Sequence, residues 1–76
     1  MITPEQCRMA RAALRLGVRD LAAMSTVSAM TINRFENGRS GGHAATLRKI
    51  ETALTAAGVD FIAENGGGPG VRLRKP

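Results

Sequence analysis

The sequence predicts a mainly α protein: a compact four-helix domain over residues 1–58, followed over residues 59–76 by a β-hairpin or a tail. Four segments place apolar residues at helical spacing, and residue types that cap helices flank them. After Gly58 the pattern changes to two short apolar runs separated by a glycine-rich stretch, which is typical of strands joined by a loop. The 76 residues suffice for one domain with a small core, which a second copy of the chain would extend.

The first predicted helix begins at Thr3-Pro4 and runs from Pro4 to about Leu14. Threonine caps free backbone N–H groups, and proline is tolerated at the first helical position. Gln6, three residues after Thr3, completes a capping box. The residues predicted to face inward are Cys7, Ala10 and Leu14. A second, short helix starts after Gly17, and its inward stripe is Val18, Leu21, Ala22 and Ser25.

The third predicted helix, from Ser28 to Asn37, follows the second after only a few residues. Ser28 is its N-cap, and Val27 and Ile32 form a hydrophobic staple. Asn37-Gly38 supplies a left-handed C-cap. Helices joined by so short a turn pack at a steep angle, which is the helix-turn-helix arrangement.

A fourth helix is predicted after a Ser/Gly loop from Arg39 to Gly42. It starts at about His43 or Ala44, and Gly58 closes it after Ala57. Its inward residues are Leu47, Ile50, Leu54 and Ala57.

The last part of the chain contains two predicted strands, Val59–Ile62 and Val71–Leu73, with a loop over residues 65–70. An isolated two-stranded ribbon is marginal in water, so a disordered tail is the alternative, and the pattern favours the hairpin. Alternation places apolar side chains on one face, namely Val59, Phe61, Val71 and Leu73. We expect this face to form a homodimer contact.

The charge balance is strongly basic. Eleven Lys and Arg against six Asp and Glu give a net charge of +5, and nine of the cations are arginines, which suit bidentate contacts to phosphate and guanine. A polyanionic partner explains this excess, and so does a solvated basic surface. Charge alone does not choose between them.

The sequence predicts a soluble, cytoplasmic protein, located at the nucleoid if it binds DNA. The single cysteine, Cys7, allows no intrachain disulfide and is interpreted as a buried small hydrophobic residue. No apolar run approaches the roughly 20 residues that span a bilayer, and no basic region followed by an apolar stretch marks a secretory signal. We therefore expect no contact with a membrane.

Signals of catalysis are missing from the sequence. The glycine run lacks the Gly-Lys-Ser/Thr ending that opens a nucleotide-binding helix. The only histidine, His43, has no Cys, Asp or Glu at ligand spacing. One histidine and six scattered acids assemble no Ser-His-Asp or paired-carboxylate site. We expect no enzyme activity, no cofactor and no metal.

A helical wheel divides the third helix into two faces. Ile32 and Phe35 face the core, whereas the outward side carries Met30, Asn33, Arg34 and Asn37. An α-helix fits the major groove of B-DNA, where Arg contacts guanine and Asn contacts adenine. Asn33 and Arg34 are therefore candidate base readers, although spacing alone is equally consistent with solvated side chains.

Two stretches, 14–22 and 27–38, resemble the phage repressor and Cro-like helix-turn-helix family, often called the XRE family. The most specific piece is Val27-Ser28 followed by Thr31-Ile32, a large apolar residue, Glu36 and Gly38. The likeness covers about residues 4 to 57. It implies a compact four-helix, repressor-like domain that binds operator DNA as a dimer, with the third helix in the major groove. The implied function is that of a sequence-specific, double-stranded-DNA-binding transcriptional regulator.

The resemblance also implies roles for particular positions. Base-edge contacts fall on Ala29, Met30, Asn33 and Arg34. Phosphate contacts, which position a protein without reading sequence, fall on Ser28, Thr31, Asn37 and Arg39. Family members often pair an Arg of the first helix with the Glu that ends the third, here Arg11 and Glu36, and the wheel independently turns Glu36 toward the core. We expect a structural ion pair.

The sequence departs from the family pattern in several places. Arg15 and Thr26 stand at turn positions where glycine is common, and Val18 replaces a frequent DNA-contacting Gln. Ala29 and Met30 are apolar at the leading reading positions, which points to thymine methyl groups or to DNA shape. The alternative is a protein-interaction module, an anti-activator or antitoxin-like partner that keeps the fold without reading an operator.

Overall fold

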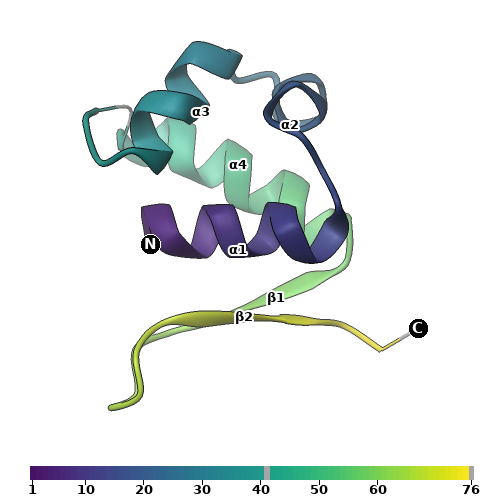
Figure 1. The fold of residues 1–76 in the computed structure, drawn as a ribbon, viewed down its shortest axis with the longest axis vertical. Coiled ribbons are helices and arrows are strands. Elements are labelled where there is room, and N and C mark those ends of the chain that lie inside the picture. Colours follow the sequence, from purple (N-terminus) through teal and green to yellow (C-terminus); the bar gives the residue numbers. More distant parts are fainter. Residues whose placement is uncertain (41, 76) are drawn as a thin grey trace.

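Four helices and a two-stranded antiparallel sheet form the part of the chain, residues 1–40 and 42–75, that the computed structural model describes (Figure 1). The elements are α1 (Pro4–Leu14), α2 (Val18–Ser25), α3 (Ala29–Glu36), α4 (Ala44–Ala56), β1 (Val59–Ile62) and β2 (Gly70–Leu73). The predicted mainly α domain with four helices and a C-terminal hairpin is confirmed at this level. Gly41 in the predicted Ser/Gly loop and Pro76 in the predicted C-terminal segment lie outside the described residues.

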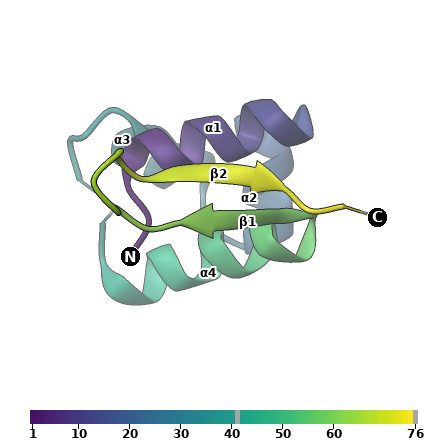
Figure 2. The same cartoon turned by 90° about the horizontal axis from the view of Figure 1, so that it is seen from below.

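The elements stack in three layers. The helix pair α1 and α4 occupies the middle, with α2 and α3 on one side and the sheet on the other (Figures 1 and 2). β2 packs mainly on α1, and β1 packs mainly on α4. The sheet and α3 therefore lie on opposite sides of the molecule.

Local side chains set the helix boundaries. The hydroxyl of Thr3 accepts from the backbone N–H of Gln6 at 3.0 Å, and Gln6 Oε1 accepts from the backbone N–H of Thr3 at 2.9 Å, which is the predicted capping box. At the start of α2, Asp20 accepts from the backbone N–H of Gly17 at 2.8 Å. Arg15 and Thr26 adopt left-handed backbone, with φ of 58° and 60°. The two departures from glycine are thus accommodated at strained positions.

The core lies between the helices and continues into the sheet. Its buried apolar residues are Ile2, Cys7, Ala10, Leu21, Val27, Ile32, Phe35, Leu47, Ile50, Leu54 and Val59. The prediction that Ala57 faces inward is wrong, because α4 ends at Ala56 and Ala57 is an exposed C-cap. No helix within the described ranges is long and apolar enough to cross a membrane.

The hairpin shares the core of the helices. Val59 is fully buried, and its partner across the sheet, Leu73, is 53% exposed. Phe61 and Val71, on the same face, pack against the core, so most of the face expected to contact a second copy covers the helices of its own chain. Gln6, itself buried, donates from Nε2 to the carbonyls of Ile62 (3.0 Å) and Gly70 (2.9 Å), one on each strand. One α1 side chain therefore fastens both strands where the loop leaves the sheet.

Candidate nucleic-acid interface

The outward face of α3 carries most of the base-reading positions expected from the sequence. Met30, Asn33 and Arg34 are exposed, and Ala29 is half-buried. On the opposite side of the same helix, Ile32 is fully buried. The side chains of Asn33 and Arg34 make no hydrogen bond or ion pair within the described part of the chain. Their amide and guanidinium groups thus have no partner among residues 1–40 and 42–75, and Arg34 alone offers five guanidinium N–H donors.

Two of the expected phosphate-contact residues form the N-cap of α3. Ser28 Oγ accepts from the backbone N–H of Thr31 at 3.1 Å and donates to Thr31 Oγ1 at 2.9 Å. Ser28 is exposed and Thr31 is half-buried. Both hydroxyls therefore have a structural partner already, and the first turn of α3 is fixed by them.

The other two expected phosphate-contact residues lie just after α3. Asn37 is the exposed C-cap, and Gly38 follows with a φ of 71°, as the left-handed C-cap prediction requires. The backbone N–H of Arg39 donates to the carbonyl of Arg34 at 2.9 Å, so the exposed Arg39 is held close to the end of the helix. Arg34 and Arg39 place two cations at this end of α3.

A buried ion pair anchors α3 to α1. Glu36 accepts from Arg11 Nε at 2.7 Å and from Arg11 Nη2 at 2.6 Å, and its side chain is only 5% exposed. Arg11 Nη1 donates to the carbonyl of Leu16 at 3.1 Å, in the connection before α2. Arg11 thus ties together α1, the connection from α1 to α2, and the end of α3. The structure thus brings together the ion pair that was expected from the sequence.

Sequence reasoning missed two further residues at this anchor. Cys7 Sγ donates to Glu36 Oε2 at 3.1 Å, and Arg8 Nη1 donates to the backbone carbonyl of Glu36. Cys7 is one helical turn before Arg11, so both project from the same face of α1. That spacing is the signal that would have placed the thiol beside the carboxylate.

Electrostatics keep Glu36 ionised and Cys7 protonated. Burial raises the pKa of Glu36, but hydrogen bonds from Arg11 and Cys7 and the nearby positive charges lower it by more, and the net pKa lies below its ordinary value. Burial, followed by the hydrogen bond and charge of Glu36, raises the pKa of Cys7 to about 12. Cys7 is therefore a neutral thiol donor, consistent with its predicted role as a buried small residue.

The remaining cations spread over several faces. Arg72 and Arg74 pair with Asp60 on the sheet, at 3.8 and 3.1 Å, and Arg8 pairs with Glu5 at 3.7 Å. Exposed cations without an ion pair among residues 1–40 and 42–75 are Arg15, Arg19, Arg34, Arg39, Arg48, Lys49 and Lys75. Asp60 on the sheet partly neutralises Arg72 and Arg74, whereas Arg34 and Arg39 at the end of α3 form no ion pair in the described part of the chain.

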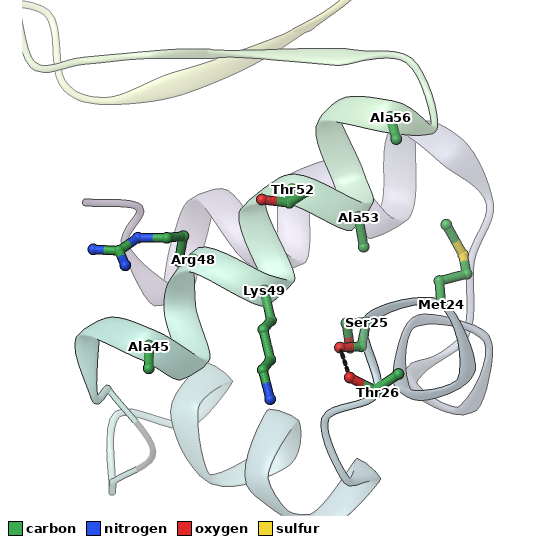
Figure 3. Close-up of a pocket in the computed structure, with 9 residues that line it drawn as sticks. All are labelled: Met24, Ser25, Thr26, Ala45, Arg48, Lys49, Thr52, Ala53 and Ala56. Carbon is green, nitrogen blue, oxygen red and sulfur yellow. Dashed lines mark hydrogen bonds between the residues drawn. The ribbon is translucent and has the colours of Figure 1, made fainter.

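A separate open groove of about 630 Å³ runs between α2 and α4 (Figure 3). Its lining is Met24, Ser25, Thr26, Ala45, Arg48, Lys49, Thr52, Ala53 and Ala56, mostly small or apolar residues. Lys49 extends into the space between the helices, whereas Arg48 extends away from α2 (Figure 3). None of these residues belongs to α3.

The described residues contain no group of three or more His, Cys, Asp or Glu side chains that could hold a metal ion. His43, the N-cap residue of α4, is exposed and makes no side-chain capping bond. Comparison of the chain with protein-family models and with curated proteins finds no match.

Proposed function

We propose that this chain is a sequence-specific, double-stranded-DNA-binding transcriptional regulator. In this proposal α2 and α3 form the helix-turn-helix of a repressor-like domain, and α3 enters the major groove. Asn33 and Arg34 read base edges, while Asn37 and Arg39 contact phosphates next to them. The basic net charge supports a polyanionic partner.

One observation carries the proposal: Asn33 and Arg34 are exposed and have no side-chain partner in the described part of the chain, on a helix whose other face is buried. A core requires only the buried face, so the polar face is available for a ligand. Side-chain amide and guanidinium groups match adenine and guanine edges in the major groove. The Arg11–Glu36 anchor fixes the direction in which this face points, which base reading requires.

The test is selection of bound fragments from a random DNA pool, followed by affinity measurement on the selected site. We expect Arg34→Ala to lose about 1–3 kcal/mol, or roughly 5- to 150-fold, at one base position. Lys75→Ala removes one positive charge beyond the end of β2, where the described residues form no ion pair with it, and should leave base preference unchanged. Equal losses in both variants, or affinity that does not fall with added salt, would contradict base reading.

We further propose that the regulator binds as a homodimer through the hairpin. Leu73 is 53% exposed, whereas Phe61 and Val71 pack against the core, so Leu73 supplies most of the apolar surface that the hairpin leaves open. Leu73→Lys should convert the dimer to a monomer in sedimentation. Removal of the whole hairpin is a poorer test, because it also removes Val59 from the core. A Leu73→Lys variant that sediments as a dimer would place the contact elsewhere.

The groove between α2 and α4 favours a second candidate, a protein-interaction module. Its apolar lining and its two cations, Arg48 and Lys49, which form no ion pair among the described residues, are complementary to an amphipathic helix with carboxylates along one edge. Under this alternative an acidic helical peptide binds, and Lys49→Glu abolishes binding while the matched Lys75→Glu does not. Steep salt dependence with duplex DNA, together with a selected sequence, favours the regulator instead.

A further inference from the structure

The first turn of α3 presents an apolar surface where the proposed function places a base-reading surface. Met30 is 62% exposed, the most exposed large apolar side chain in any helix of the described residues. Ala29 beside it is half-buried and offers only a methyl group. Neither side chain donates or accepts a conventional hydrogen bond of the kind that distinguishes base edges.

The two hydroxyl groups of this turn bond each other within the helix. Ser28 Oγ bonds both the backbone N–H and the hydroxyl of Thr31. The cap therefore engages the hydroxyls on either side of Ala29 and Met30 in the sequence. Met30 is therefore the large exposed side chain of this turn, and it presents a thioether and a methyl group.

The edges of the bases in the major groove carry only one apolar group, the C5-methyl of a pyrimidine. Thymine has this methyl, and 5-methylcytosine presents the same group at the same ring position. A flexible, polarizable thioether adapts to such a contact. A purine edge or an unmethylated cytosine presents donors and acceptors that Met30 leaves unpaired, which costs binding free energy.

We propose that Met30 reads a pyrimidine C5-methyl group in the bound DNA, an inference that rests on the DNA-binding function proposed above. Arg34 lies one turn further along the same face of α3, about 6 Å along the helix axis from Met30. B-DNA rises about 3.4 Å per base pair, so the two side chains address positions about two steps apart. The preferred site pairs a methyl-bearing pyrimidine, read by Met30, with a nearby guanine, read by Arg34.

The experiment removes single methyl groups from the DNA. A duplex selected with the full chain is resynthesised with deoxyuridine in place of each thymidine in turn, and affinity is measured by fluorescence anisotropy at fixed salt. Loss of one buried methyl group, worth about 0.8 kcal/mol, predicts roughly fourfold weaker binding at the position that Met30 reads. A parallel series replaces each cytosine by 5-methylcytosine. If affinity increases at one of these positions and no thymidine position responds, the methyl group that Met30 contacts belongs to 5-methylcytosine.

Substitutions in the protein test whether Met30 is the side chain that contacts the methyl group. In Met30→Ala the ratio of affinities for thymidine and deoxyuridine duplexes should fall to about 1, while Met9→Ala, which shortens an exposed methionine of α1, keeps the wild-type ratio. Met30→Gln, which keeps the length but adds an amide, should shift preference toward adenine. Discrimination that persists in Met30→Ala, or a wild-type protein indifferent to every methyl group, overturns the assignment. A chain that binds no duplex in a saturable, salt-dependent way refutes the DNA-binding proposal itself.

Discussion

The Arg11–Glu36 pair gives the sharpest prediction about stability. Glu36→Gln keeps the shape of the side chain but removes the charge that compensates Arg11. Both side chains are largely shielded from water, with 20% of Arg11 and 5% of Glu36 exposed. The glutamine amide offers Arg11 one neutral acceptor where two ionised oxygens stand at 2.6 and 2.7 Å.

The expected loss follows from these contacts. Hydrogen bonds to charged groups contribute about 1.5–3 kcal/mol each, and removing one partner of a buried pair costs about 3–5 kcal/mol. Arg11 retains some contact with water, which places the loss near the lower end, at about 3 kcal/mol. A domain of 76 residues has a total stability of about 4–11 kcal/mol. The loss corresponds to a fall in Tm of about 12–24 °C.

The measurement is thermal and urea unfolding at pH 7, followed by far-ultraviolet circular dichroism. Glu5→Gln is the matched control, because its pair with Arg8 spans 3.7 Å and both side chains are well exposed. Such a surface pair contributes at most about 1 kcal/mol. If Glu36→Gln lowered Tm no more than Glu5→Gln does, the pair would not be an anchor and the reasoning would be refuted.

Three other measurements test neighbouring features. The pKa of Glu36 is lowered in the folded protein, so as the pH falls the unfolded state takes up a proton first. The free energy of unfolding should therefore be constant above about pH 5 and decrease as the pH falls through the lowered pKa of the folded state. Glu36→Gln removes this carboxylate, so its free energy of unfolding should change less in acid than that of the wild type, and an equally steep decrease would contradict the reasoning. Because burial and Glu36 raise the pKa of Cys7 to about 12, iodoacetamide at pH 8 should alkylate it only as fast as the protein opens, and rapid alkylation under native conditions would show an accessible thiolate. Thr26→Gly should raise stability by about 1 kcal/mol by relieving the left-handed backbone at φ 60°, and an unchanged urea midpoint would show that no strain is stored there.

Features decided by a few neighbouring residues were predictable from the sequence. The start of α1 follows from Thr3, Pro4 and Gln6, and the end of α3 follows from Asn37-Gly38, because a capping side chain acts within about four positions of itself. The inward-facing stripes of the helices are also local features, because helical periodicity repeats every three or four positions. Periodicity failed at Ala57, where the helix had already ended.

Contacts between distant segments were not predictable in this way. The choice between a hairpin and a disordered tail depends on Gln6, which bonds Ile62 and Gly70 more than fifty positions away, and on Val59 entering the core. A two-stranded ribbon gains its stability from such packing, and no local pattern in residues 59–76 reports it. The hydrogen bond from the Cys7 thiol to Glu36 likewise joins two segments that are far apart in the sequence.

The anchor and the proposed reading face are linked through the shortness of α3. A helix of eight residues is not stable in isolation, so the position of Asn33 and Arg34 depends on what holds the buried side of the helix. Ile32 and Phe35 supply non-directional burial, which tolerates small rotations, whereas the two bonds from Arg11 to Glu36 fix a direction. Substitution of Glu36 should therefore weaken base discrimination even under conditions where the variant remains folded. Nonspecific DNA affinity, which depends on charge more than on direction, should change much less.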